Sequence, residues 1–147
     1  LKRRWKKKRE KQKKISNQGL YIKQNFVNWG MAFEITKNGN HTLVKVNSDR
    51  IDTYNAPDLK SELVVINNKG EKNIVLDLSS CNYCDSSGLR SVLVANRLCE
   101  DAIGTFILCG LQPDVENLVK ISMLDSILLI TKTVEEAKDL LKKKENL

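Results

Sequence analysis

Hydrophobic and polar positions alternate in short runs over most of the chain. Two runs, at residues 33–36 and 42–46, have the pattern of β-strands and are separated by Lys37-Asn38-Gly39-Asn40. Asn-Gly between two such runs is a strong signal for a hairpin turn. We therefore expect these two strands to pair antiparallel.

Helix-like and strand-like segments alternate in the rest of the chain. Helical spacing of apolar residues predicts helices at 53–68, 86–99, 113–121 and 134–144, and apolar runs predict strands at 73–78, 105–108 and 126–130. Strands joined through helices form mainly parallel sheets. The pattern predicts an α/β fold with a mixed sheet of four to five strands. That sheet is mostly parallel, carries an antiparallel N-terminal hairpin and is packed by about four helices.

Charge divides the chain near Met31. Residues 1–30 carry eleven of the 25 Lys and Arg but only one of the 18 Asp and Glu. The net charge of +7 therefore comes from this segment, and residues 31–147 are net negative. A block of like charges repels itself and stays disordered. We expect residues 1–30 to be a basic, disordered extension and residues 31–147 to be the folded domain.

Two interpretations of the extension stay open. As an arm, it would make weak contact with a polyanion or an anionic membrane surface, and nucleic-acid binding through it would depend steeply on salt. Direct DNA binding by the domain itself is not expected. Alternatively, the extension is not native, because the chain opens on Leu1 while Met31 stands where the folded pattern begins. Residues 21–30 have some apolar character and could pack on the domain.

Composition places the chain among globular proteins, with 41% hydrophobic and 29% charged residues. No run approaches the roughly 20 apolar residues of a membrane-spanning helix. No apolar segment of the kind found in secretory signals follows the basic start. We therefore expect a cytoplasmic protein with reduced cysteines.

The segment Asp85-Ser86-Ser87-Gly88-Leu89 follows a predicted buried strand and opens a predicted helix. A serine at a helix start can cap the helix with its hydroxyl, and the free N–H groups there bind anions. A phosphate on Ser86 would be held by its own helix and would add about −1.5 to −2 charges beside Asp85. Simple capping by Ser86 is the structural alternative.

A longer segment around this motif, NIVLDLSSCNYCDSSGLRSVLVANR, resembles the signature of STAS domains. In that signature, a buried strand ends in Asp-Leu-Ser, and Asp-Ser-Ser-Gly-Leu opens a helix after a short loop. Arg50-Ile51-Asp52 followed by Ala56, and residues 106–113 and 123–127, resemble further parts of the family in the right order. The resemblance covers residues 31–147 and is to the anti-sigma factor antagonist type.

The resemblance implies a regulatory protein rather than an enzyme, with no cofactor. In such antagonists, the serine after the motif aspartate is phosphorylated by the anti-sigma factor, which is an ATP-dependent serine kinase. That serine matches Ser86, with Ser87 as the alternative acceptor. The unphosphorylated form binds the anti-sigma factor and releases the sigma factor. Phosphorylation ends this binding, and a metal-dependent serine phosphatase restores it.

The resemblance also implies which residues surround the phosphorylation site. Asp52 matches the acidic residue that family members place beside the serine, and Asp85 is the acid of the motif itself. Val94 and Leu98 fall off the apolar stripe of their helix, so we expect them to line a docking surface. The full set expected to shape the site and contact the partner is Asp52, Asp85, Ser87, Gly88, Leu89, Arg90, Val94 and Leu98.

Three positions depart from the family pattern. Ser48-Asp49 stands where the family often has a glycine, Cys84 replaces a larger apolar residue, and Met123 replaces a common glycine before Leu124. These changes do not alter the expected fold, but they leave the identity of the partner undetermined.

The alternative function is a STAS subunit or scaffold of a membrane transport system for lipids or anions.

Cys81 and Cys84 have the spacing of a metal knuckle or a redox pair. A structural zinc site needs four ligands, and Cys99, Cys109 and His41 do not form a second knuckle. A position before a helix N-terminus could lower the pKa of Cys84 as in a redox pair. Small buried cysteines are the commoner explanation. We expect no metal site and no catalysis, because His41 has no nucleophile or acid spaced around it.

Overall fold

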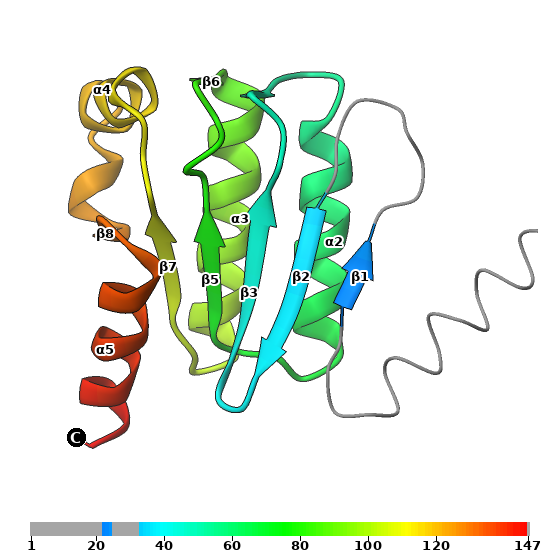
Figure 1. The fold of residues 1–147 in the computed structure, drawn as a ribbon, viewed down its shortest axis with the longest axis vertical. Helices are drawn as coiled ribbons and strands as arrows, with labels where there is room; N and C mark the ends of the chain where they lie inside the picture. The colour runs from blue at the N-terminus through cyan, green and yellow to red at the C-terminus, as the bar shows by residue number, and fades with distance from the viewer. Residues whose placement is uncertain (1–21, 25–32, 147) are drawn as a thin grey trace, which may run out of the picture.

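The computed structural model describes residues 22–24 and 33–146, which form a six-stranded mixed sheet flanked by helices (Figure 1). The sheet strands, in the order in which they lie side by side, are β1 (Ile22–Gln24), β2 (Phe33–Asn38), β3 (His41–Val46), β5 (Ile74–Asp77), β7 (Phe106–Cys109) and β8 (Leu129–Thr131). The helices are α2 (Ala56–Asn68), α3 (Ser86–Asp101), α4 (Pro113–Ile121), the 3-10 turn η1 (Leu124–Ser126) and α5 (Val134–Glu145).

Two layers of helix cover the sheet because β5 and β7 are apolar on both faces. Ile74, Leu76 and Phe106 point into the larger core with α2, α3 and α4, whereas Val75 and Ile107 pack against α5. In Figure 1, α2 and α3 lie behind the sheet. Burial on both faces is what the continuous apolar runs predicted.

The pairing of the strands confirms the expected α/β class. β2 and β3 pair antiparallel around Gly39, which has a positive φ of 40°, and β3, β5, β7 and β8 are parallel neighbours. β1 adds a strand that the pattern did not predict, with Ile22 opposite Thr36. β1 comes from the segment assigned to the basic extension. The rest of that extension, including its possible polyanion contact, lies outside the described residues.

Two predicted boundaries are wrong for local reasons. Helix α2 begins at Ala56 rather than at residue 53, because residues 52–55 form a turn in which the Ala56 N–H donates to the Asp52 carbonyl at 2.8 Å. The last strand begins at Leu129 rather than at residue 126, because the 3-10 turn brings the Leu128 N–H to the Leu124 carbonyl at 2.8 Å.

None of the helices in residues 33–146 is long and apolar enough to cross a membrane.

Met123 follows α4 with φ at 59° and ψ at 21°, which is the left-handed region. Its N–H donates to the Lys120 carbonyl at 3.0 Å, as in the C-terminal caps of helices, where glycine is the usual residue. A side chain in this conformation costs about 1–2 kcal/mol. The geometry thus explains why a glycine is common here in the family that the sequence resembles.

We expect Met123→Gly to raise the free energy of unfolding by about 0.5–1 kcal/mol, because relief of the left-handed strain exceeds the entropy that glycine gains in the unfolded chain. Chemical denaturation would measure the change. Ser122→Gly is the matched control, since Ser122 has φ at −80° and gains no relief. Equal effects of the two substitutions would contradict this account.

His41 is buried where α5 meets the β2–β3 hairpin. Its Nδ1 lies 2.8 Å from the Asn40 side-chain oxygen, and the Asn40 amide donates to Glu145 of α5 at 2.9 Å. Its Nε2 is buried and has no hydrogen-bond partner among the described residues. Burial, and then the nearby Lys138 charge, lower the pKa of His41 below its ordinary value, and Glu145 partly offsets them.

A lowered pKa in the folded state means that the unfolded chain binds the His41 proton first as pH falls. Stability should therefore decrease as pH falls below about 6.5, by at most about 1.4 kcal/mol per pH unit for this single proton. Denaturation curves between pH 7.5 and 5 would show a flatter dependence in His41→Gln than in the unmodified protein. Identical slopes in the two proteins would refute the assignment to His41.

Candidate functional site

A second, two-stranded sheet builds the site beyond the end of the main sheet. β4 (Arg50–Ile51) and β6 (Tyr83–Cys84) pair parallel, with Ile51 opposite Cys84. The Asp85 N–H extends this pairing by donating to the Ile51 carbonyl at 3.1 Å. The loop that begins at Asp52 therefore lies beside the N-terminus of α3, although 33 positions separate Asp52 from Asp85 in the numbering.

Asp85 caps helix α3. Its Oδ1 accepts hydrogen bonds from the Ser87 N–H at 2.8 Å and from the Gly88 N–H at 3.1 Å. Its Oδ2 accepts a longer hydrogen bond from the Thr53 hydroxyl at 3.4 Å. A carboxylate at this position satisfies two of the helix's unpaired donors and complements the positive end of its dipole.

Ser86 is the first residue of α3 and is exposed. The expectation that its hydroxyl could act as the helix cap is wrong, because Asp85 holds the N–H groups that a cap would bind. No described residue forms a hydrogen bond with the Ser86 hydroxyl. For the same reason, the N–H groups of Ser87 and Gly88 are not free to hold a phosphate on Ser86.

The loop carrying Asp52 is fixed by its own hydrogen bonds. The Asp52 Oδ1 accepts from the Tyr54 N–H at 3.0 Å, and the Asp52 N–H donates to the Asn55 side chain at 2.8 Å. Asn55 also donates to the Arg50 carbonyl at 2.9 Å. The structure thus brings Asp52 and Asp85, the two predicted acids, onto adjoining backbone segments.

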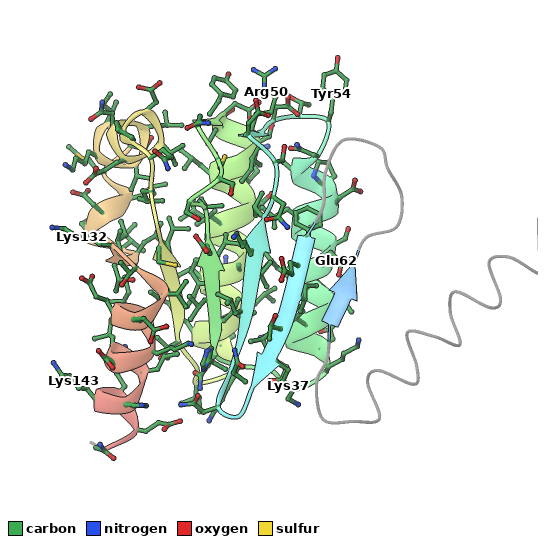
Figure 2. All side chains as sticks on the ribbon, in the orientation of Figure 1. Lys37, Arg50, Tyr54, Glu62, Lys132 and Lys143 are labelled. Atoms are coloured by element: carbon green, nitrogen blue, oxygen red, sulfur yellow. The ribbon has the colours of Figure 1, made fainter. Side chains whose placement is uncertain are left out.

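Arg50, Tyr54 and Tyr83 form a rim of large side chains at the same end of the molecule. The Arg50 guanidinium lies 5.0 Å from the centre of the Tyr83 ring and 3.7 Å from Asp52 Oδ2. Tyr54 is 93% exposed, and Figure 2 shows it at the same end of the domain as Arg50. Sequence reasoning did not assign this rim, because the pairing of β4 with β6 that creates it was not predicted.

Gly88 and Leu89 set how closely α3 approaches the small sheet. A Cβ on Gly88 would collide with the Cys84 sulfur and would stand 2.9 Å from Ile51 Cγ2. Leu89 is buried in the main core. Ser91, also buried, donates to the Ala56 carbonyl at 3.0 Å and so ties α3 to the start of α2. These contacts require glycine at position 88 for space rather than for an unusual backbone angle.

The remaining predicted docking residues lie further along α3. Arg90 is exposed one turn after Ser86, while Val94 and Leu98 are half-buried. Neither Val94 nor Leu98 is among the partly buried side chains that pack against the two cores of the described domain. Leu98 lies about 120° around the helix from Ser86. Its carbonyl accepts a hydrogen bond from the Asn67 side chain of α2 at 3.3 Å, so this part of α3 lies next to α2.

The cysteines near the site are buried thiols. Cys81 and Cys84 are 0% and 6% exposed, and burial raises the pKa of Cys84 to about 12, with smaller effects from Cys81 and Asp85. A reactive redox cysteine needs the opposite shift. No group of three or more His, Cys, Asp or Glu side chains in the part of the chain that the structure describes could hold a metal ion.

We expect Gly88→Ala to lower the free energy of unfolding by about 2–3 kcal/mol, because the added methyl forces α3 away from β4 and β6. The exposed Ser86→Ala change should stay within about 0.5 kcal/mol. In a Cys84→Ala background, the closest contact is gone, so Gly88→Ala should cost at least about 1 kcal/mol less. Unfolding by denaturant would test all three, and an unchanged cost in that background would exclude the steric explanation.

Comparison with known proteins places this geometry in a family. Residues 32–137 match the family described as the STAS domain. A Bordetella bronchiseptica protein, BtrV, carries a provisional name as an anti-sigma factor antagonist. It is 36% identical over 87 residues, which are 59% of this chain and 75% of BtrV.

Solved structures share the fold. The structure of the anti-sigma factor antagonist SpoIIAA in its unphosphorylated form has a TM-score of 0.66 and 21% identity, over 76% of this chain and 97% of that one. The phosphorylated form of SpoIIAA, a Bacillus cell fate determinant, has a TM-score of 0.59 and 22% identity, over 74% and 97%. Part of the murine anion transporter Slc26a9 is also similar, with a TM-score of 0.60 and 14% identity over 73% of this chain and 18% of the transporter.

The structural likenesses, at these low identities, concern the fold alone, whereas the family match spans most of the described domain and the relative is covered over three quarters of its length. The chain belongs to the STAS domain family.

Proposed function

We propose that this protein is an anti-sigma factor antagonist and that a phosphate on Ser86 switches it off. The unphosphorylated form binds an anti-sigma factor serine kinase in the cytoplasm and thereby releases the sigma factor. The name given to BtrV, the relative that is 36% identical, supports the antagonist role. SpoIIAA, which has the same fold, has been solved in unphosphorylated and phosphorylated forms, and this supports a switch of that kind.

The observation that carries the proposal is that Asp85 and Ser86 have different roles at the start of α3. Asp85 provides the helix cap, while Ser86 presents an exposed hydroxyl that no described residue binds. A serine needed for capping would be held by its own helix and poorly placed for a kinase. Ser87 is only half-buried and remains the alternative acceptor.

Phosphorylation transfers the γ-phosphoryl group of ATP to the Ser86 oxygen. The oxygen forms a bond to the γ-phosphorus of ATP, the bond from that phosphorus to the β–γ bridging oxygen breaks, and ADP leaves. The hydroxyl proton passes to a base of the kinase. A metal-dependent serine phosphatase reverses the state by hydrolysis, which releases inorganic phosphate and restores the hydroxyl.

The effect on binding is electrostatic. A phosphate adds about −1.5 to −2 charges next to Asp85 and Asp52, whose backbone segments adjoin. An interface that covers these groups must remove water from all of them. An uncompensated charge in a buried interface costs about 3–5 kcal/mol, which corresponds to a loss of affinity of at least about 100-fold.

The docking surface extends from the serine over the exposed part of α3 and the loop before α2. We keep Arg90, Val94 and Leu98 from the sequence prediction, and we add Arg50 and Tyr54. Arginine and exposed aromatic residues supply much of the binding energy in protein interfaces. Gly88 and Leu89 act indirectly, by fixing the position of the helix.

We expect the full-length protein to gain one phosphate, detected by intact mass, when it is incubated with ATP and an anti-sigma-type serine kinase from its source organism. Ser86→Ala should abolish the added mass, whereas Ser87→Ala should retain it. Affinity for the kinase should fall at least about 100-fold after phosphorylation.

If the added phosphate persists in Ser86→Ala but disappears in Ser87→Ala, then Ser87 is the acceptor. No phosphate with any kinase of this type would refute the switch. The role of a subunit or scaffold in a lipid- or anion-transport system would then be the better explanation, as the similar fold within Slc26a9 allows.

A further inference from the structure

A phosphate on Ser86 would enter an acidic site with few free hydrogen-bond donors. Asp85 already occupies the N–H groups of Ser87 and Gly88, and Asp52 lies on the adjoining loop. Both carboxylates carry the same sign of charge as a phosphate and would repel it. If the phosphorylated side chain is to be ordered, a cation on this chain must supply the contact.

Two arginines of the described domain belong to the segments that form this site: Arg50 in β4 and Arg90 in α3. Arg50 already contacts Asp52 at 3.7 Å and stacks on the ring of Tyr83 at 5.0 Å. Arg90 is exposed, and no acidic side chain among the described residues pairs with it. Arg90 therefore has its full set of guanidinium donors to offer.

The helix places Arg90 correctly for such a contact. Residues four apart on an α-helix lie on the same face with their Cβ atoms about 5–6 Å apart. Ser86 and Arg90 have this spacing, and both belong to α3. The order also matters, because an anion on the N-terminal side and a cation on the C-terminal side complement the helix dipole. Arginine can bind two phosphate oxygens at once.

We propose that Arg90 is the residue that binds the phosphate on Ser86 and orders it against α3. This inference rests on the proposed phosphorylation of Ser86 and adds a specific role for Arg90, which sequence analysis placed only among the docking residues. The contact changes the docking surface in two ways. It fixes the new anion in place, and it withdraws the Arg90 cation from contact with an acidic group of the partner.

The test uses full-length protein with phosphoserine incorporated at position 86 during translation, so that no kinase is needed. Phosphorus NMR would follow the titration of the phosphate between its singly and doubly charged forms, which has a pKa near about 6 in an exposed phosphoserine. Asp52, Asp85 and Arg50 affect every variant equally. Differences between variants therefore report on the substituted arginine.

We expect Arg90→Gln to raise the phosphate pKa by about 0.3–0.7 unit, because the cation that favours the dianion is lost. Arg90→Lys should restore part of the shift. Arg97→Gln is the matched control, because Arg97 is exposed on nearly the same face but about 16 Å along the helix, beyond the screening length of physiological salt. The phosphate pKa in Arg97→Gln should equal that in the phosphoserine protein that retains Arg90 and Arg97.

An unchanged pKa in Arg90→Gln would overturn the proposed contact, and so would an equal shift in Arg97→Gln. Neither result would bear on whether phosphorylation controls binding. That question is answered separately by comparing the affinity of the phosphoserine protein and the unmodified protein for the anti-sigma factor. Equal affinities of the two proteins would refute the switch. That result would leave the phosphate pKa measured by NMR, and thus the proposed Arg90 contact, unaffected.

Discussion

The pairing of β4 with β6 is the contact on which the site depends. These strands have only two residues each, yet they hold together the loop before α2 and the start of α3. The Asp85 N–H continues the pairing to the Ile51 carbonyl, and the closeness of Gly88 to Ile51 lets the helix lie directly against it. This pairing sets the backbone of the loop that begins at Asp52 beside the start of α3, where Ser86 lies.

The cap on α3 gives the site its chemical character. Because the Asp85 carboxylate binds the N–H groups, the start of the helix is already neutralised and no longer attracts an anion as an uncapped helix would. The neighbouring serine is thereby left exposed, and any phosphate on it gains little from its own backbone. Under the proposed phosphorylation of Ser86, the local response would therefore depend on the side-chain charges of Asp52, Asp85, Arg50 and Arg90.

Residues that depart from the family pattern show how much variation the fold accepts. Cys84 fills the space beneath Gly88, where its sulfur is buried and its thiol pKa is raised to about 12. Met123 adopts a left-handed conformation that glycine would adopt without strain. Ser48 is buried, and its hydroxyl donates to the Arg50 carbonyl at 3.0 Å just before β4. None of these changes alters the exposed serine or its acidic neighbours.

The sequence by itself determined the fold class and the position of the motif. Apolar runs at β5 and β7 are buried on both sheet faces, and the Asn38-Gly39 turn joins an antiparallel hairpin, because hydrophobic period and turn chemistry are local properties. Motif resemblance singled out Asp52, Asp85 and Ser86 as candidate site residues. It could not tell which side chain caps the helix, since Asp85 and Ser86 are both good caps and only the backbone angles decide between them.

Only the tertiary structure decided what surrounds the serine. Strands of two residues carry almost no periodic signal, so β4 and β6 could not be found from the pattern, and with them the rim of Arg50, Tyr54 and Tyr83 was missed. The need for glycine at position 88 is likewise a matter of distance to Cys84 and Ile51, which lie 4 and 37 positions earlier in the numbering. The approach of α3 to Ile51 arises from packing between distant segments, and local sequence does not encode it.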